Sequence, residues 1–435
     1  MESPPILAPF RGLRYSAAKI RNLAEVMAPP YDVISPARQA ELYERNPFNL
    51  VRLILPQQQP DDKPGHNRYT RAAADLQNWV RDGTLVRDSR STLYLYEQDF
   101  SLPGEGARRF QRRGFIALRL LEEFGANVRP HEQTLSGPKM DRLSLITNCH
   151  AHLSPVFALY SDRSGEVLKS LTTFFTETSP DLDLVDNEEI RHRLWRVEER
   201  EAIRSVSEQM AKKTIFIADG HHRYETAIAY RNQMRQQYPN AVTNAPFNYV
   251  MIYFNEISDP GLVILPTHRV VTSKGKAFDE GELLGRLRGS FRVESFRSEH
   301  RDQFFRALAD LQGDRRGFGI TLSRGEKFHL IAADKGETRL DVLLVHEEFF
   351  QNFLGLGKEE QRERVRYVQP LRQVLKILEK ESGSIAVFLN PPVAEDLISV
   401  MGQGRILPPK TTYFYPKLLS GLVLHPIDPT ERVTI

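Results

Sequence analysis

Residues 214–227 read TIFIADGHHRYETA, and this stretch decides how the middle of the chain folds. Ile215, Phe216 and Ile217 form a short apolar run of β-branched and aromatic residues, which predicts a buried strand. Gly220 permits a backbone turn that other residues resist, and a helix is expected to begin near His221. The sequence therefore predicts a strand-to-helix corner, with two histidines and an arginine at the start of the helix.

This predicted corner has the chemistry of a phosphate site. The first backbone N–H groups of a helix lack partners within the helix and carry the positive end of its dipole, so they attract anions. His221, His222 and Arg223 add side-chain donors, and an arginine fork suits phosphate oxygens. Asp219, at the strand end, has the chemistry to hold a metal ion or to take a proton from a hydroxyl. The alternative is structural, because Asp-Gly is a common turn and Asp a common helix cap.

The composition sets the class of protein. A chain of 435 residues predicts two or three domains. The net charge is only +3, from 59 basic and 56 acidic residues, which argues against a nucleic-acid coat. One cysteine, Cys149, excludes a disulfide framework and favours a reducing cytoplasm. With neither a signal-peptide pattern nor an apolar run of about 18 residues, we expect a cytoplasmic protein without membrane segments.

Several nucleotide and enzyme motifs are missing from the sequence. It contains no GxxxxGK[ST], no GxGxxG after a strand, no GxSxG and no CxxC. P-loop kinases, Rossmann dehydrogenases, α/β-hydrolases and zinc ribbons therefore have no support. The adjacent histidines also do not match the HxxxH pattern, which argues against a zinc site on the predicted helix alone.

Strands and helices alternate along the chain, which predicts an α/β fold with a mixed sheet. Ala72, Leu76 and Trp79 recur at helical spacing, which predicts a helix. An antiparallel hairpin is predicted from the two β-rich segments 91–100 and 108–121. The segment 46–56 is expected to be a loop entering a strand, and 339–345 a strand. We expect an N-terminal α/β region (1–150), a core carrying the corner (151–274), an inserted or separate α/β unit (275–350), and a strand–helix region whose aromatic tail packs on the core (351–435).

A second polar cluster lies in RPHEQTLSGPKMDR, residues 129–142. The density of acid, base and cation in a glycine-containing loop suggests ligand handling, and a lysine beside such a turn is suited to contact phosphate as a point charge. The alternative is a solvated connection with ordinary salt bridges. The candidates within this cluster are His131, Glu132, Thr134, Lys139, Asp141 and Arg142.

Three shorter motifs complete the set. MAPPYDVISP (27–36) presents Asp32 from a rigid turn, although it is equally read as a plain turn. LPTHRVV (265–271) places His268 and Arg269 at a strand end, where the alternative is an edge-strand histidine. KTTYFYPKL (410–418) offers aromatic walls and a lysine to a pocket, or core packing.

Seven separated motifs together resemble one large bacterial and archaeal family, catalogued as a domain of unknown function numbered one-thousand-and-fifteen. They occur in the family's order and cover nearly the whole chain: APPYDVIS, NPFNLVRLILP, HEQTLSGPKMDRLSL, SPVFALYSD, ADGHHRYETAIAYR, LPTHRVV and TTYFYPKLLSGLV.

More distantly, the DGHHR corner resembles the Asp-Gly-x-His-Arg signature of the ParB/sulfiredoxin-like superfamily. The resemblance implies a ParB/sulfiredoxin-like core, with Asp219 near the transferred phosphoryl group and His222 and Arg223 on nucleotide phosphates. The corner lacks the cysteine that sulfiredoxin needs, and no DNA-reading helix-turn-helix of ParB is evident. The free-serine-kinase branch fits best. Its members use an N-terminal glutamate as base, for which Glu25, Asp32 and Glu41 are candidates and Asp32 is our choice.

These features predict a nucleotide-dependent phosphotransferase that acts on free L-serine or a related hydroxy metabolite, with ATP or ADP and Mg²⁺ as cofactors. The expected catalytic residues are Asp219, Asp32 and His221, with Asp219 also the metal ligand. The expected phosphate-binding residues are Gly220, His222, Arg223, Lys139 and Arg142. The expected substrate-binding residues are His131, Glu132, Thr134, His268 and Arg269.

Two alternative functions remain open at this point. One is a phosphatase acting on a phosphorylated metabolite such as phosphoserine. The other is a ParB-like CTP-binding switch or DNA-associated module, against which the near-balanced charge counts. The expected partners are a small-molecule substrate and a nucleotide, without nucleic acid or membrane, and the sequence does not fix the oligomeric state.

Overall fold

The computed structural model describes residues 3–103, 108–125, 127–132, 136–273, 278–311, 315–322, 325–334, 336–369, 371–381 and 383–435. The chain forms two compact units. The first unit comprises Met1–Pro130, Thr134–Val263 and Pro416–Ile435, and the second comprises His131–Gln133 and Ile264–Tyr415. Both combine helices with a sheet, so the predicted mixed α/β class is confirmed. The four-region division expected from the sequence stays a prediction.

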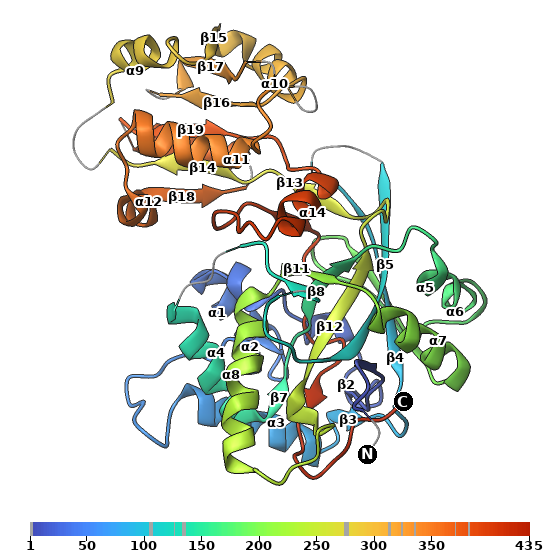
Figure 1. Ribbon diagram of the computed structural model, residues 1–435. Coiled ribbons are helices and arrows are strands. Elements are labelled where there is room, and N and C mark those ends of the chain that lie inside the picture. The colour runs from blue at the N-terminus through green and yellow to red at the C-terminus, as the bar shows by residue number, and fades with distance from the viewer. Residues whose placement is uncertain are drawn as a thin grey trace. The chain divides into compact units, whose positions relative to one another are not determined.

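The first unit is built on a mixed sheet whose described strands number nine. They lie in the order β6–β11–β8–β12–β5–β4–β10–β9, with β1 paired to β5 (Figure 1). Strand β11 runs parallel to β6 and antiparallel to β8, and β12 runs parallel to β8. The predicted hairpin is confirmed as β4–β5. The bounds are β1 (Leu7–Ala8), β4 (Leu93–Ser101), β5 (Arg109–Leu120), β6 (Val128–Arg129), β8 (Val156–Tyr160), β9 (Leu182–Val185), β10 (Arg191–Val197), β11 (Ile215–Asp219) and β12 (Tyr249–Glu256).

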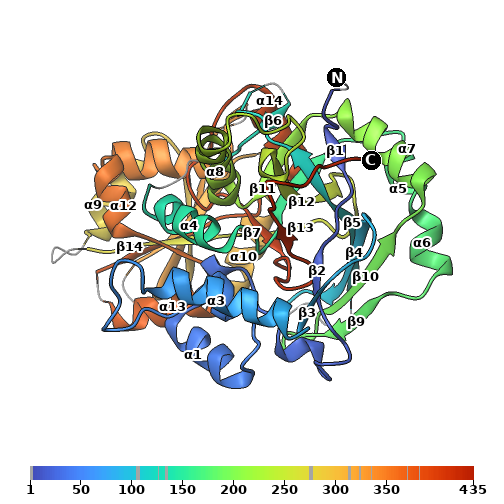
Figure 2. The same cartoon turned by 90° about the horizontal axis from the view of Figure 1, so that it is seen from below.

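One face of this sheet forms the main core of the first unit. Ile217 of β11 and Phe115 of β5 share a buried cluster with Val206 and Tyr224, which come from two helices. Burying a side chain of this size stabilises the fold by about 1.5–3 kcal/mol. Figure 2 shows α4 and α8 side by side near β11, and α5, α6 and α7 grouped together, with α7 against β1 and α6 against β10. The bounds are α4 (Ser136–Cys149), α5 (Glu166–Lys169), α6 (Thr172–Glu177), α7 (Arg200–Ala211) and α8 (His221–Gln237).

Short elements surround this sheet. The helix predicted from Ala72, Leu76 and Trp79 is confirmed as α3, which buries these three side chains and begins with a capping box formed by Asn67 and Thr70. The remaining elements of the first unit are β2 (Leu13–Tyr15), η1 (Leu23–Glu25), η2 (Tyr31–Val33), α1 (Pro36–Arg45), α2 (Val51–Ile54), α3 (Arg68–Arg81), β3 (Leu85–Arg87), β7 (Ala151–His152), η3 (Pro246–Asn248) and β21 (His425–Pro426).

Two predictions for this unit are wrong. Segment 46–56 contains helix α2 instead of the start of a strand, because a short buried apolar run has no periodicity that separates the two. Segment 129–142 is not one loop, since α4 begins at Ser136. The polar, glycine-containing stretch suggested a loop, but polar residues and proline are both tolerated in the first turn of a helix, where a missing N–H would have no partner in the helix.

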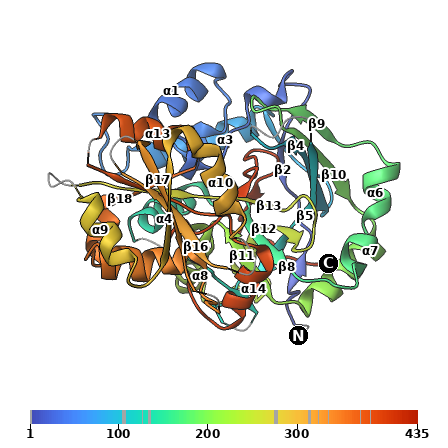
Figure 3. The same ribbon diagram turned by 90° about the horizontal axis from the view of Figure 1, so that it is seen from above.

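The second unit is built on an antiparallel sheet whose described strands lie in the order β15–β17–β16–β19–β14–β18. Helices α9 and η6 bury apolar side chains in one cluster against this sheet, and α10 and α13 in another. Figure 3 shows α9, α10 and α13 beside these strands. The strands are β13 (Val263–Leu265), which pairs with β20 (Tyr413–Tyr415), β14 (His268–Val271), β15 (Arg292–Arg297), β16 (Gly317–Thr321), β17 (Lys327–Ala332), β18 (Val365–Val368) and β19 (Ile385–Phe388). The helices are α9 (Glu280–Leu287), η4 (Ser298–His300), α10 (Arg301–Ala309), α11 (Asp341–Leu343), the π-helix η6 (Leu344–Phe353), α12 (Lys358–Arg364), α13 (Leu371–Lys380) and α14 (Ala394–Gly402).

The strand predicted at 339–345 is also wrong. This segment holds α11 and the beginning of η6. The run RLDVLLV is apolar enough for either element, but Val342, Val345 and Phe349 are buried at helical spacing, so packing decides the helix. Within the described ranges, no helix is both long enough and apolar enough to cross a membrane.

Candidate functional site

The strand-to-helix corner in the first unit forms as the sequence predicts. Strand β11 ends at Asp219, and α8 begins at His221 with Gly220 at its N-cap position. Between them, Gly220 has φ of 89° and ψ of 29°, in the left-handed region that side chains disfavour. The register of the pairing between β11 and β8 shifts between Ile217 and Asp219, at the end of β11.

Gly220 also makes room for Arg223. A Cβ atom at position 220 would lie 2.8 Å from Nε of Arg223 and 2.9 Å from its Cζ. We therefore expect Gly220→Ala to lower the free energy of unfolding by about 1–2 kcal/mol from backbone strain and to displace the guanidinium. Gly165→Ala is the matched control, because Gly165 has φ of 68° with nothing near its Cβ position. Urea unfolding measures the change in the free energy of unfolding, and nucleotide titration measures the effect of the displaced guanidinium on nucleotide affinity. A Gly220→Ala protein with the stability and nucleotide affinity of the wild type would contradict this prediction.

Arg223 is fixed by bonds to the chain before β8. Its Nη1 donates to the carbonyl of Pro155 and to Oγ of Ser154, the latter at 3.3 Å. Its Nη2 lies 3.8 Å from Oδ1 of Asp219, and its buried Nε has no hydrogen-bond partner among the described residues. The guanidinium is therefore oriented by the fold and retains donor capacity.

Asp219 is paired with a lysine from the end of the chain. Nζ of Lys417 lies 3.1 Å from Oδ2 of Asp219, and both side chains are largely buried. The main chain beside this lysine is also held, because the Lys417 carbonyl accepts from Gln98 and the Pro416 carbonyl accepts from Arg112. The corner thus combines two cations, Arg223 and Lys417, with one carboxylate.

A pocket lies beside this corner. Arg142 and Arg223 both line it, so the structure brings together two of the predicted phosphate-binding residues. Arg142 is buried, donates to the Ile54 carbonyl at 2.5 Å, and lies over the Tyr31 ring at 4.0 Å. Its charge is partly compensated by Asp141, with which it forms an ion pair.

Hydroxyl groups add to the polar lining of this pocket. Tyr31, Ser154 and Thr226 contribute them. Burial raises the pKa of the Tyr31 hydroxyl, against the opposing effect of the Arg142 charge, so this group remains a donor at neutral pH. Two arginines and three residues with hydroxyl groups thus line the pocket together with apolar residues such as Leu145, and guanidinium groups suit an anion with several oxygen atoms.

The other residues predicted for the first unit are not among the residues that line this pocket. Lys139 is ion-paired with Glu225 of α8. His221 is buried and His222 is half-buried at the start of that helix. Asp32 is exposed on η2, next to Tyr31 of the pocket.

The alternative base candidates are already bonded. Glu25 accepts hydrogen bonds from Asn22 and Asn46. Hydrogen bonds from Arg38 and Arg45 lower the pKa of Glu41.

The predicted substrate-binding residues belong to the second unit, apart from Thr134, which lies outside the described residues. Nε2 of His131 lies 2.8 Å from the Thr412 hydroxyl, and Glu132 accepts from the backbone N–H groups of Lys410 and Thr412. These two residues hold segment 410–412. Burial lowers the pKa of His268 to about 4, so the ring is neutral, and it packs against Phe388.

The described residues contain no group of three or more His, Cys, Asp or Glu side chains placed to hold a metal ion. The corner offers one carboxylate, that of Asp219. That donor set does not suit a structural zinc site, but it suits Mg²⁺, which binds through one or two carboxylates together with waters and substrate phosphates.

Sequence reasoning missed four residues of this arrangement as individual candidates: Tyr31, Ser154, Thr226 and Lys417. All four lie within the quoted motifs 27–36, 154–162, 218–231 and 410–418. Their position beside Arg142, Arg223 or Asp219 distinguishes them from other residues, and local sequence patterns do not predict that position.

Similar solved structures share low sequence identity with this chain. A conserved hypothetical protein from Pyrococcus furiosus is 15% identical, with 67% of this chain and 90% of that protein covered and a TM-score of 0.33. A free serine kinase in complex with AMP is 12% identical, with coverage of 66% and 83% and a TM-score of 0.32. SbnI with C-terminal truncation, from Staphylococcus aureus, is 11% identical, with coverage of 68% and 83% and a TM-score of 0.34. These similarities assign no function.

Among the curated proteins, none matches this chain. The family model described as "Protein of unknown function (DUF1015)" matches residues 7–350, which is most of the sequence. The chain therefore belongs to the DUF1015 family, as its seven motifs predict.

Proposed function

We propose that the first unit binds the phosphates of a nucleotide at the start of α8 and transfers a phosphoryl group to the hydroxyl of a small metabolite. The observation that carries this proposal is that Arg142 and Arg223, from different helices, line one pocket beside the N-terminus of α8. Cations and a helix N-terminus that converge on one space favour a phosphate ligand.

The phosphate groups would contact Arg223, Arg142 and Lys417. The two arginines supply planar forks for bidentate bonds, and the lysine supplies a point charge. Gly220 lets the backbone and the guanidinium approach closely, since a side chain there would meet Arg223. This arrangement would place positive charge where a phosphoryl group passes between two oxygens.

Phosphoryl transfer requires positioning and charge neutralisation more than covalent chemistry from the protein. The acceptor oxygen forms a bond to phosphorus while the bond from phosphorus to the leaving nucleotide oxygen breaks, and the hydroxyl proton passes to a carboxylate. Asp32 is the proposed acceptor of that proton, because it lies next to Tyr31 at the pocket. Asp219 would hold Mg²⁺, which neutralises phosphate charge when bound with the nucleotide.

L-Serine is the first acceptor to test, because the DGHHR corner resembles that of the free-serine kinases. We expect the full-length protein, given ATP, Mg²⁺ and L-serine, to produce ADP and phosphoserine, which phosphorus NMR separates. L-Alanine, which lacks the hydroxyl, is the matched control and is expected to remain unchanged.

Other outcomes of this experiment discriminate between functions. Release of inorganic phosphate from phosphoserine without nucleotide would replace the proposal with a phosphatase. Absence of both nucleotide binding and transfer to any hydroxy amino acid would contradict it.

A further inference from the structure

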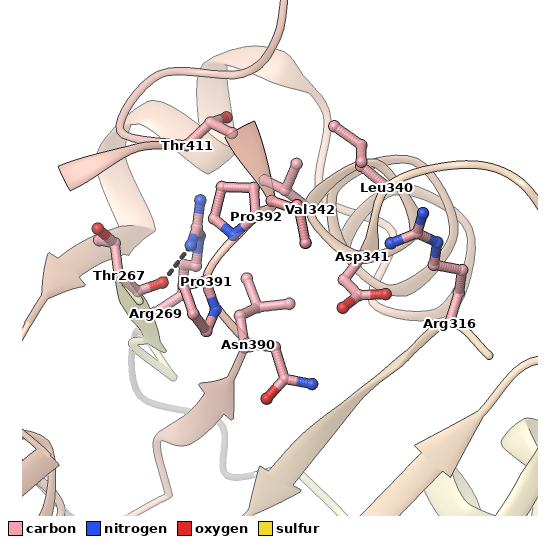
Figure 4. Close-up of a pocket in the computed structure, with 12 residues that line it drawn as sticks. Thr267, Arg269, Arg316, Leu340, Asp341, Val342, Asn390, Pro391, Pro392 and Thr411 are labelled. Atoms are coloured by element: carbon pink, nitrogen blue, oxygen red, sulfur yellow. Dashed lines mark hydrogen bonds between the residues drawn. The ribbon is translucent and has the colours of Figure 1, made fainter. Parts of the chain in front are cut away.

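A second pocket lies within the second unit and takes no part in the function proposed above. Figure 4 shows Arg269 between Thr267 and Pro391, with Arg316 and Asp341 farther along the same pocket. These residues come from β14, from α11 and from the segments that flank β16 and β19.

Arg269 is a buried cation whose bonds all go to neutral groups. Its side chain is among the most buried in the protein, and the residue is 1% exposed. The guanidinium donates to the carbonyls of Thr267 and Lys410, the latter at 3.3 Å, and lies 5.4 Å from the centre of the Tyr367 ring. Its Nε has no hydrogen-bond partner in the part of the chain that the structure describes.

The nearby acidic side chains have other partners. Glu132 acts electrostatically on Arg269, but its carboxylate accepts from the backbone N–H groups of Lys410 and Thr412. Asp396 forms an ion pair with Arg316 at 2.8 Å.

Asp341, which lines the same pocket, accepts from the backbone N–H of Gly317 at 3.0 Å. The pocket therefore contains one guanidinium, that of Arg269, that has no ion-paired carboxylate among the described residues.

Glu132 acts on Arg269 electrostatically, but no carboxylate among the described residues is directly paired with this guanidinium, and a buried charge is stabilised most by a directly paired counterion. A ligand that brings one negative charge would compensate it, and the planar guanidinium matches a planar carboxylate. The buried hydroxyl of Thr267 also has no hydrogen-bond partner among the described residues, so it offers a further donor. A dianionic phosphate suits the pocket less well, because the carboxylate of Asp341 lines it too.

We propose that this pocket binds a small monocarboxylate, whose carboxylate group pairs with Arg269. Apolar side chains, including Pro391, Pro392 and Val393, form the rest of the lining and would contact the carbon skeleton of the ligand. The site is distinct from the pocket of the first unit, since all its lining residues belong to the second unit.

Thermal unfolding of the full-length protein tests this proposal. The probes are acetate, pyruvate and L-lactate, with acetamide and lactamide as neutral controls and inorganic phosphate as a competing anion. We expect at least one carboxylate to raise Tm by about 2 °C or more near saturation, and its neutral counterpart to have no effect. Calorimetric titration of the same probe gives the affinity.

Two variants locate the binding. Arg269→Met is expected to abolish the Tm shift, and its Tm without ligand should not fall far, because the substitution removes a buried charge. Val393→Trp, at an exposed rim position (40%), is expected to block the pocket without disturbing the core. Val80→Trp is the matched control, since Val80 is exposed to a similar extent (43%) in the first unit.

The outcomes are distinguishable from those for the nucleotide site. Carboxylate binding should persist in Arg223→Ala, which alters only the pocket of the first unit. A Tm rise that survives in Val393→Trp, a rise caused by phosphate instead of carboxylates, or no rise with any of the three carboxylates would overturn the proposal. If Arg269→Met fails to fold, the Tm shift measured in Val393→Trp tests the proposal by itself.

Discussion

Replacing Arg223 with alanine is expected to weaken ADP binding by about 10- to 150-fold. Hydrogen bonds to charged groups contribute about 1.5–3 kcal/mol each, and this substitution removes the fork that would contact phosphate. Arg223 is held in place by Ser154 and the Pro155 carbonyl, so its contribution requires little reordering of the side chain. Isothermal titration calorimetry with ADP and Mg²⁺ measures the change.

Two further variants make this test specific. Arg223→Lys keeps the charge but not the planar fork, and we expect its affinity to lie between those of the wild type and Arg223→Ala. Arg90→Ala is the control, because the Arg90 side chain is 76% exposed and lies in a weak surface ion pair. Equal affinity in Arg223→Ala and the wild type would show that phosphate is bound elsewhere.

Replacing Asp219 with asparagine is expected to reduce the rate of phosphoryl transfer by about 10²- to 10⁴-fold, while ADP affinity changes only a few-fold. The substitution keeps the size of the side chain but removes the charge that would hold Mg²⁺ and that now pairs with Lys417. A group that acts mainly in the transition state lowers kcat without a comparable change in KM. Steady-state kinetics with the acceptor that shows transfer measures both constants.

Asp183→Asn is the matched control for this prediction. Asp183 also forms an ion pair with an arginine, Arg191, but at an exposed position of strand β9. Asp32→Asn distinguishes the proposed general base, Asp32, from the proposed metal ligand, Asp219. Loss of the general base should lower the rate and also remove the acidic limb of the pH–rate profile. A rate in Asp219→Asn equal to that of the wild type would remove Asp219 from the chemistry.

The local parts of this fold were predictable because local chemistry decides them. An apolar run followed by Asp-Gly ends a strand in the first unit, and the positive φ of Gly220 requires glycine or a strained residue. The spacing of Ala72, Leu76 and Trp79 specifies one face of α3. The same reasoning failed at 339–345, where an apolar run suits a strand or a helix equally and only packing in the second unit selects the helix.

The sequence by itself determined the family, the mixed α/β class and the corner that carries Asp219, Gly220 and Arg223, because backbone sterics and side-chain periodicity act over a few residues. Only the tertiary structure brought Arg142 and Tyr31 to the pocket of Arg223 and Lys417 to the carboxylate of Asp219. These side chains come from distant parts of the chain. Their proximity depends on strand order and on how the final segment packs in the first unit, which no local pattern specifies.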